Sequence, residues 1–357
     1  MFIGIDGNEA NIITRVGVGQ FAFNILHQLH QQDKTNHYFI YLKNPPILDM
    51  PPASNNWHYQ VFGPSKYWTR FALPLKLFFQ KIKLDLFYSP SHYSPQPCLI
   101  PTIPTIHDIG YLQSLDQFNK KDIYQLVNWT KDSLQHASHI IAVSEFTKNE
   151  LIKTYRINPK KISVVYNGIN QHHLNPDKSV LTKFKISSPY FLALGTLKPN
   201  KNYPFLIESF SKLPGNYQLV IAGKKGWLFN DIYTTVQKLH LESKVIFTDY
   251  ITEIDKISLL KYSQALVIPS TYEGFGIPAL ESQSVGTPVI AANIPPLKEV
   301  LKDSALYIDP TDQSTLVSAL KNISLHKANL IKRGTIQSQK FTWENSAKSL
   351  ITIFNHL

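Results

Sequence analysis

Residues 265–284 read ALVIPSTYEGFGIPALESQS, the pattern of a strand, a turn and a helix in succession. The first part, 265–270, predicts a buried parallel strand, because it is short, apolar and followed by turn-forming residues. The last part, 277–284, predicts a helix that tolerates Pro278 in its first turn. Strands that alternate with helices build a doubly wound parallel sheet, so we expect an α/β fold.

Two carboxylates, Glu273 and Glu281, lie eight positions apart across this turn. Gly274 and Gly276 let the backbone approach a ligand closely. The free N–H groups at the start of the helix favour an anion such as a diphosphate. Carboxylates beside a phosphate make electrostatic sense when they accept hydrogen bonds from hydroxyl groups. These residues therefore predict a nucleotide sugar as the ligand.

Length and composition fit two such domains. The chain has 357 residues, more than one ordinary domain, and 43% apolar residues supply two cores. The single cysteine, Cys98, excludes an internal disulfide and is expected to pack as a small hydrophobe. No basic leader precedes the first predicted strand, and no apolar run reaches the ~20 residues of a membrane span, so we expect a cytoplasmic protein.

The net charge of +11 is spread evenly over both halves, which argues against a dedicated nucleic-acid domain. The exception is 66–83, with five basic residues, no acidic residue and many aromatic ones. Two interpretations of this segment stay open. It docks on the inner face of an anionic membrane, with Trp68 and Phe71 at the interface and lysines near the head groups (Lys76, Lys81, Lys83). Alternatively, it is an ordinary helix packed on the first sheet with solvated lysines.

The pattern predicts two α/β domains, 1–170 and 187–340, joined by a linker over 171–186 and followed by a final amphipathic helix over 341–357. Strands of the first domain are expected at 2–5, 38–42, 84–88, 100–106, 140–143 and 162–165, and helices at 19–30, 121–136 and 145–155. Strands of the second domain are expected at 190–194, 218–222, 245–247, 265–269, 289–291 and 305–308.

The segment around Glu273 resembles the E-x7-E motif of retaining glycosyltransferases of family 4, which have the GT-B fold. The resemblance covers nearly the whole chain and is carried by further stretches: a glycine loop after the first strand, a His-Asp pair, VSEFT at 143–147, VYNG at 165–168 and FTWE at 341–344. The stretch GKKGW at 223–227 also resembles bacterial mannosyltransferases that build surface polysaccharides. The resemblance implies two Rossmann-like domains that face each other across a cleft. It also implies an acceptor-binding first domain, a nucleotide-sugar-binding second domain and a final helix that packs back on the first.

The loop at 195–202, GTLKPNKN, resembles the family's G-x4-R-K-N loop, whose basic residues hold the donor diphosphate. Lys201 matches the lysine of that pattern, and Lys198 adds a nearby charge. Asn200 stands where the family has arginine, so the bidentate grip of a guanidinium is lost. Taken alone, Lys201 is more typical of an exposed lysine in a turn, and it is the combination with the Glu273 loop that favours phosphate binding.

The first domain offers a glycine loop and a histidine. Gly17 and Gly19 open a predicted helix, and the resemblance places their loop under the donor phosphates. His107 ends a predicted strand, where the family has a histidine against the transferred sugar, near its 6-hydroxyl. Asp108 either orients a loop or faces the acceptor, and Arg15 is assigned to the acceptor side.

The resemblance assigns Glu273 to the 3- and 4-hydroxyls of the sugar and Glu281 to the ribose. Backbone N–H groups of the intervening loop would contact the sugar or phosphate (Gly274, Phe275, Gly276). Glu273, His107 and Lys201 are the predicted catalytic residues. The expected reaction is a front-side displacement in which the leaving phosphate helps to deprotonate the acceptor. No Asp-x-Asp motif and no Cys/His cluster with zinc spacing occurs, so we expect neither a metal nor another cofactor.

The sequence therefore predicts a retaining hexosyltransferase in bacterial surface polysaccharide synthesis. The expected donor is GDP-mannose, or otherwise a UDP-linked sugar, and the expected acceptor is a glycan or a lipid-linked glycan. Nucleic acid is not expected as a partner. One alternative is another GT-B enzyme, either a nucleotide-sugar epimerase or a phosphorylase. The other is a degenerate, non-catalytic sugar-binding scaffold, for which Asn200 is the only support.

Overall fold

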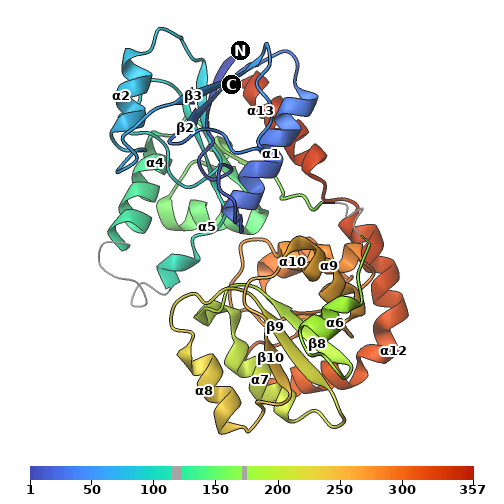
Figure 1. The fold of residues 1–357 in the computed structure, drawn as a ribbon. Coiled ribbons are helices and arrows are strands. Elements are labelled where there is room, and N and C mark those ends of the chain that lie inside the picture. Colours follow the sequence, from blue (N-terminus) through green and yellow to red (C-terminus); the bar gives the residue numbers. More distant parts are fainter. Residues whose placement is uncertain (114–122, 171–174) are drawn as a thin grey trace. The chain divides into compact units, whose positions relative to one another are not determined.

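The computed structural model describes residues 1–113, 123–170 and 175–357 and divides the chain into two compact units. The first unit comprises Met1–Gly168 and Thr342–Leu357, and the second comprises Ile169–Phe341 (Figure 1). Each unit is a parallel sheet covered by helices, so the predicted α/β class with two doubly wound domains is confirmed.

The first unit contains a seven-stranded sheet in the order β3-β2-β1-β4-β5-β6-β7, and every pairing is parallel. Its strands are β1 (Phe2–Asp6), β2 (His37–Leu42), β3 (Trp57–Val61), β4 (Leu86–Ser89), β5 (Thr102–Ile106), β6 (Ile140–Ala142) and β7 (Ile162–Val164). The strand order reverses between β1 and β4, which makes their carboxyl ends the switch point of this sheet.

Helices cover this sheet on both faces (Figure 1). They are α1 (Val18–Gln32), α2 (Ala72–Phe79), α4 (Thr130–His136), α5 (Glu145–Tyr155) and α13 (Trp343–His356), with the short turns η1 (Gly110–Gln113), η3 (Gln125–Trp129) and η4 (Pro159–Lys161). The C-terminal helix α13 packs against α1 and buries Trp343, Leu350 and Phe354 in the core that β1 and β2 share. The chain thus returns to its first unit after completing the second.

The second unit contains a six-stranded parallel sheet in the order β10-β9-β8-β11-β12-β13. Its strands are β8 (Tyr190–Leu194), β9 (Gln218–Ala222), β10 (Val245–Phe247), β11 (Leu266–Ile268), β12 (Val289–Ala292) and β13 (Leu306–Ile308). Its helices are α6 (Ser179–Lys183), η5 (Pro199–Lys201), α7 (Tyr203–Ser211), α8 (Asn230–Lys238), α9 (Glu253–Tyr262), α10 (Ile277–Ser284), α11 (Pro295–Leu301) and α12 (Gln313–Ser338). Here the strand order reverses between β8 and β11.

Local signals in the sequence set several helix boundaries. Helix α5 begins after Ser144, whose side chain accepts a hydrogen bond from the Thr147 N–H, and helix α9 begins with a capping box between Thr252 and Asp255. Of the segment predicted as the linker, residues 175–186 hold α6. Its Lys183 donates to both carboxylate oxygens of Asp255, at 2.8 and 2.7 Å.

Two local predictions differ from the structure. The edge strand β3 was not predicted, because WHYQV is only half-buried and its alternation is weak. The helix predicted over 121–136 is interrupted by the π-helical turn η3 before α4, and its residues 121–122 lie outside the described residues. None of the helices in the described ranges combines the length and the apolar composition that a membrane span requires.

Candidate functional site

In the second unit, the predicted site residues follow neighbouring strands at the carboxyl edge of the sheet. Lys201 lies in the turn after β8, and Glu273 lies in the loop after β11, so the two residues flank the switch point. Lys201 Nζ contacts Glu273 Oε1 at 2.6 Å, and each side chain is 14% exposed. Because open parallel sheets bind ligands outside their switch points, this ion pair marks the candidate site.

Glu273 is held by a second donor that sequence reasoning missed. Ser270 Oγ donates to the same Oε1 atom at 2.6 Å, and Ser270 is fully buried. Gly195 leaves room for the Lys201 side chain, because a Cβ atom at Gly195 would lie 3.1 Å from Cε of Lys201. The lysine and the hydroxyl therefore fix one carboxylate oxygen, and neither contact uses Oε2 of Glu273.

The buried phenol of Tyr203 holds the loop after β8 in place. Tyr203 donates from its hydroxyl to the Gly195 carbonyl at 3.1 Å. Burial, and then the charge of Glu273, raise the pKa of Tyr203, so the phenol stays protonated and remains a donor. This hydrogen bond thereby anchors the loop after β8, which carries Lys201 of the Lys201–Glu273 pair.

Asn200, which replaces the family's arginine, ties two loops together. Its side chain donates to the Tyr272 carbonyl at 3.0 Å, and its own carbonyl accepts from the Thr271 N–H at 3.0 Å. Asn202 adds a similar link, because its side chain donates to the Pro269 and Pro310 carbonyls. Asn200 therefore joins the Lys201 loop to the Glu273 loop, a positioning role that the sequence pattern did not indicate.

Helix α10 carries the second carboxylate. Gly276 caps this helix at a φ of 98°, which favours glycine, and a Cβ atom there would lie 2.5 Å from the Leu297 side chain. Glu281 Oε1 accepts from Lys256 Nζ at 2.6 Å, and Lys256 also pairs with Glu253 at 2.8 Å. Burial disfavours the ammonium, but the two carboxylates outweigh it and raise the pKa of Lys256. Lys256 therefore stays charged beside Glu281.

Lys256 could not be found from the motif. It lies on α9, 25 positions before Glu281, and nothing in its local sequence distinguishes it from other helix lysines. Lys198, in contrast, lies over the Trp227 ring, 5.3 Å from its centroid. The loop that carries Trp227 packs tightly on the loop after β8, since a Cβ atom at Gly223 would lie 2.0 Å from the Gly195 carbonyl oxygen. The structure thus brings Lys198, Lys201, Glu273 and their loops to one edge.

In the first unit, the glycine loop opens α1 close to the end of β1. Gly17 caps α1 at a φ of 45°, and a Cβ atom there would meet nothing within 4 Å. Gly19 is tightly packed, because its Cβ atom would lie 3.0 Å from the Glu9 carbonyl oxygen. The backbone at Gly17 is therefore open to a ligand, whereas Gly19 is needed for packing.

Arg15 is engaged within the fold. Its guanidinium makes two hydrogen bonds of 2.7 Å to the Asp49 carboxylate, and its Nε donates to the Ala10 carbonyl. The same group lies 3.7 Å from the centroid of the Phe23 ring. All these contacts order the loop before α1. The assignment of Arg15 to the acceptor side stays a prediction. In that role its side chain would fix the position of the loop before α1.

His107 lies at the end of β5 and packs against residues from α1 and from the segment after β4. Its Nε2 lies 3.1 Å from the Pro90 carbonyl, and its ring packs edge-on against Phe21 and parallel to His92. Since a carbonyl only accepts, Nε2 carries the proton and Nδ1 is left as an acceptor. Asp108 accepts from the Gly110 N–H at 2.9 Å and so orders the following turn.

Burial, together with the neighbouring His92, lowers the pKa of His107 to about 4. The folded pKa lies below the unfolded value of about 6.5, so the folded state favours the neutral ring. Stability is complete above pH 6.5 and is lost as the pH falls towards 4, because the unfolded chain binds the proton first. We expect His107 alone to cost about 2 kcal/mol of unfolding free energy at pH 5. Urea unfolding at pH 5 and 7.5 measures this difference.

The matched variants for this prediction are His107→Gln and His356→Gln. The first should flatten the pH dependence by about 2 kcal/mol between the two pH values. The second replaces an exposed histidine at the end of α13 and should leave the dependence unchanged. Burial also lowers the pKa of His92, with the nearby Asp108 opposing it, so some dependence should remain in His107→Gln. An unchanged slope in His107→Gln would contradict the assignment.

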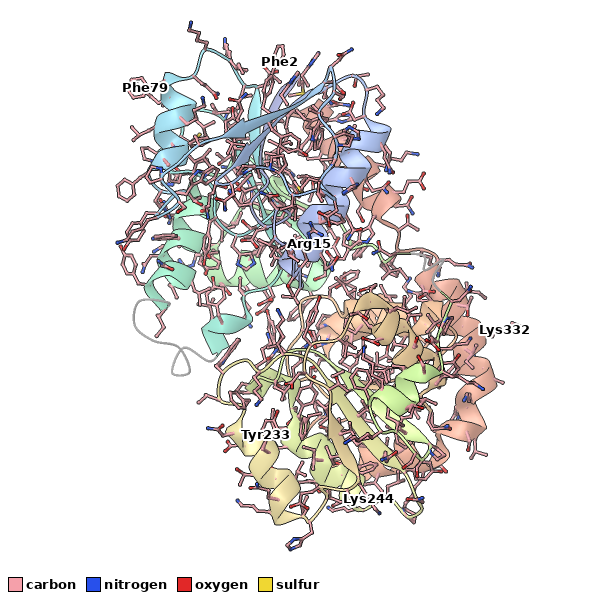
Figure 2. The ribbon with its side chains drawn as sticks, in the orientation of Figure 1. Phe2, Arg15, Phe79, Tyr233, Lys244 and Lys332 are labelled. Carbon is pink, nitrogen blue, oxygen red and sulfur yellow. The ribbon has the colours of Figure 1, made fainter. Side chains whose placement is uncertain are left out.

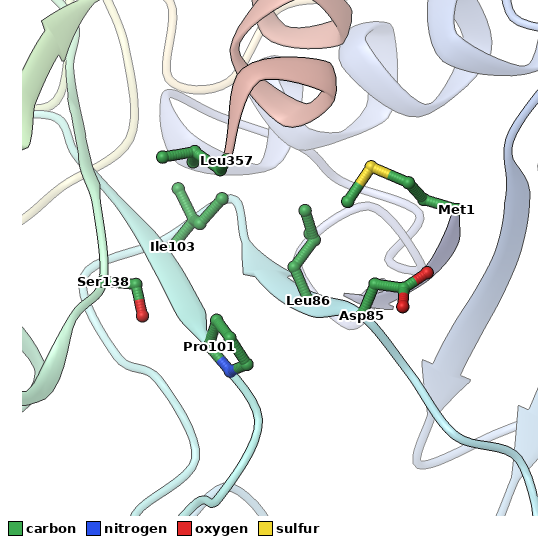
Figure 3. A pocket seen from close by; sticks show the side chains of 7 residues that line it. All are labelled: Met1, Asp85, Leu86, Pro101, Ile103, Ser138 and Leu357. Atoms are coloured by element: carbon green, nitrogen blue, oxygen red, sulfur yellow. The ribbon is translucent and has the colours of Figure 1, made fainter.

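One pocket lies at the opposite, amino-terminal edge of the first sheet (Figure 3). It has a volume of about 540 Å³ and is lined by Met1, Asp85, Leu86, Pro101, Ile103, Ser138 and Leu357. None of the predicted site residues lines it, and its Asp85 carboxylate already accepts from the Phe2 N–H. In the described part of the chain, no group of three or more His, Cys, Asp or Glu side chains could hold a metal ion.

Comparisons with known families match both halves of the chain. Residues 16–173 match the model described as Glycosyltransferase Family 4, and residues 180–339 match the model described as Glycosyl transferases group 1. Together these matches span most of the sequence. The first match ends after β7 of the first sheet, and the second begins within α6, the helix that precedes the second sheet.

Two curated relatives are both named as O-antigen chain mannosyltransferases. An O-antigen chain mannosyltransferase of Salmonella typhimurium is 35% identical over 219 residues, which are 61% of this chain and 60% of the relative. An O-antigen chain mannosyltransferase of Escherichia coli is 27% identical over 76% of this chain and 74% of its own length. Among solved structures, a sucrose-phosphate synthase from Thermosynechococcus elongatus has a TM-score of 0.78 at 18% identity. It covers 99% of this chain and 98% of its own, which shows the same fold.

Proposed function

This chain belongs to the GT-B glycosyltransferases of family 4, and we propose that it transfers a hexosyl group from a nucleotide sugar to a hydroxyl group of a glycan acceptor. The observation that carries the proposal is the Lys201–Glu273–Ser270 cluster at the switch point of the second sheet. It combines a cation for a diphosphate with a carboxylate for sugar hydroxyls. A plain phosphate site would have no use for that carboxylate.

The residues of the second unit divide between the parts of the donor. We assign Lys201 and Lys198 to the charge of the diphosphate. At the start of α10, Pro278 has no N–H and the Ala279 N–H donates to the Gly276 carbonyl, so this helix start adds the Ile277 N–H as a backbone donor. Glu273 accepts hydrogen bonds from the 3- and 4-hydroxyls of the sugar through its second oxygen. Glu281, oriented by Lys256, accepts those of the ribose.

In the proposed reaction, the bond between the anomeric carbon and the diphosphate oxygen breaks, and the acceptor oxygen bonds to the same carbon from the same face. The acceptor proton goes to the leaving diphosphate, and the nucleoside diphosphate is released. Configuration is retained. His107, neutral with its Nδ1 as an acceptor, would bind the 6-hydroxyl of the transferred sugar. The protein supplies positioning and charge stabilisation, and the proposal includes no metal.

For the donor we propose GDP-mannose and for the acceptor a lipid-linked glycan of a bacterial surface polysaccharide. The names of the two curated relatives, both O-antigen chain mannosyltransferases, support this choice. An epimerase or a phosphorylase remains the enzymatic alternative, and a non-catalytic scaffold is the other. The Asn200 links argue against a scaffold, because they give the departure from arginine a positioning role.

The first test is a thermal-shift titration against GDP, UDP and ADP and their sugar conjugates, with and without EDTA. We expect GDP and GDP-mannose to raise the melting temperature, in line with about 2.7 kcal/mol of stabilisation at a hundredfold excess over Kd, and EDTA to leave this unchanged. Stabilisation by UDP alone would change the donor, and loss of the shift in EDTA would contradict metal independence. No shift with any nucleotide would favour the scaffold.

Incubation with the selected donor separates the enzymatic alternatives. Transfer needs an acceptor and releases the nucleoside diphosphate, whereas an epimerase converts the donor without an acceptor. A phosphorylase depends on inorganic phosphate. Conversion without acceptor, or a strict need for phosphate, would overturn the proposed transfer.

A further inference from the structure

Helix α2 is apolar on both of its faces, although only one is buried. Ala72, Leu73, Pro74 and Leu77 face the core beside Phe39, Tyr41 and Phe87. The opposite stripe follows the spacing i, i+4, i+7 and i+8 and is exposed: Phe71 at 62%, Leu75 at 57%, Phe78 at 67% and Phe79 at 75%. Figure 2 shows Phe79 pointing outward from this helix. A helix that is apolar on nearly all sides is normally buried. The exposed stripe therefore indicates a surface through which the helix binds another apolar phase or molecule.

Of the two aromatic residues predicted at the interface, Phe71 is exposed but Trp68 is part of the core, and that detail of the prediction was wrong. Trp68 is 1% exposed, stacks on Phe62, and donates from Nε1 to the Phe62 carbonyl at 3.1 Å. The indole packs inward because the chain turns at Tyr67 before α2 begins. The residues free to enter another phase are therefore Phe78 and Phe79, whose rings pack edge-on against each other.

Basic residues flank the exposed stripe in the sequence, on both sides of α2. No acidic residue occurs between Met50 and Leu84, and Lys66, Lys81 and Lys83 are exposed. Arg70 does not contribute, because its guanidinium pairs with Asp132. The stripe and these lysines together form what we call the α2 face: Lys66, Phe71, Leu75, Phe78, Phe79, Lys81 and Lys83.

We propose that the α2 face docks the protein on an anionic lipid surface. The phenylalanine rings enter the boundary between head groups and acyl chains, and the lysines lie among the anionic head groups. Charge decides against a second copy of this chain, because two α2 faces would bring their lysines together without a carboxylate from the same segment. A lipid surface satisfies the rings and the lysines at once.

The test is sedimentation of the full chain with vesicles of phosphatidylcholine alone and of phosphatidylcholine with 30 mol% phosphatidylglycerol. Binding is expected to the anionic vesicles and to weaken as salt rises. Phe78→Ser/Phe79→Ser should lower the partition coefficient at least about tenfold. Lys81→Gln/Lys83→Gln should lower it about 25-fold, since each lysine near an anionic surface contributes roughly fivefold.

Matched controls lie on the exposed side of α12 in the second unit. Leu325→Ser removes a side chain that is 79% exposed, and Lys321→Gln/Lys332→Gln removes two exposed charges; both should bind as the unchanged protein does. Equal recovery in the supernatant with both kinds of vesicle would overturn the proposal. So would a lipid-free dimer, measured by light scattering, that Phe78→Ser/Phe79→Ser dissociates. The readout is binding, so nucleotide-induced thermal shifts test the donor site separately.

Discussion

Glu273→Gln is expected to lower turnover about 100-fold or more while the protein still binds the nucleoside diphosphate. The carboxylate is the group assigned to the sugar hydroxyls. Its replacement removes a charge-assisted hydrogen bond, and without that bond the reacting sugar is no longer held in the orientation that transfer requires. The amide remains the size of the carboxylate but leaves Lys201, 14% exposed, without its ion-pair partner. The measurement is steady-state turnover of the donor that the thermal-shift titration selects.

A glutamate far from the site in the sequence provides the control for Glu273→Gln. Glu242→Gln changes an exposed glutamate after α8 and should leave turnover unchanged. In Glu273→Gln, the thermal shift by GDP should persist, and the additional shift by the sugar conjugate should be lost. Full turnover in Glu273→Gln would remove this residue from the site. A lost GDP shift would instead place the defect in the folding of the loop after β11.

Gly168→Ala is expected to lower the unfolding free energy of the first unit by about 3 kcal/mol or more. A Cβ atom at Gly168 would lie 2.2 Å from the Trp343 backbone nitrogen and 2.5 Å from the Thr342 carbonyl carbon. Both neighbours are backbone atoms, so no side-chain rotation relieves the clash. The start of α13 must move away, and the core contacts of Trp343 and Phe354 weaken with it. Urea unfolding followed by tryptophan fluorescence measures the loss.

A glycine with a different constraint provides the comparison. Gly17→Ala meets nothing within 4 Å, but its φ of 45° with a ψ of −108° is a backbone conformation that costs a residue with a Cβ atom about 1–3 kcal/mol. In Gly168→Ala, limited proteolysis should also release the segment after residue 341 sooner than in the unchanged protein. A loss no larger than that of Gly17→Ala would show that the two chain segments separate easily at this crossing.

Most strands and helices followed from local pattern. The apolar runs of β8, β9 and β10 have the predicted bounds, and so does α10, because buried parallel strands and the turns that end them are written in consecutive residues. The edge strand β3 escaped prediction because a half-buried strand has no continuous apolar run.

The candidate site was only partly visible in this way. The motif indicated Glu273 and Lys201, and the structure places their charged atoms in contact. The motif could not indicate Ser270 or Lys256. Serine and lysine are common residues, and these two contact Glu273 and Glu281 only because the fold brings their side chains together. The roles of all these residues in transfer stay predictions.

The sequence alone determined the α/β class, the alternation of elements and the family, since each rests on residues close together in the chain. Tertiary structure decided which side chains are available. It buried Trp68 while exposing Phe78, joined Asn200 to the loop after β11 and brought Gly168 against Trp343. These outcomes depend on strand order and on which helix covers which face. Such contacts join residues far apart in the sequence, and no local period records them.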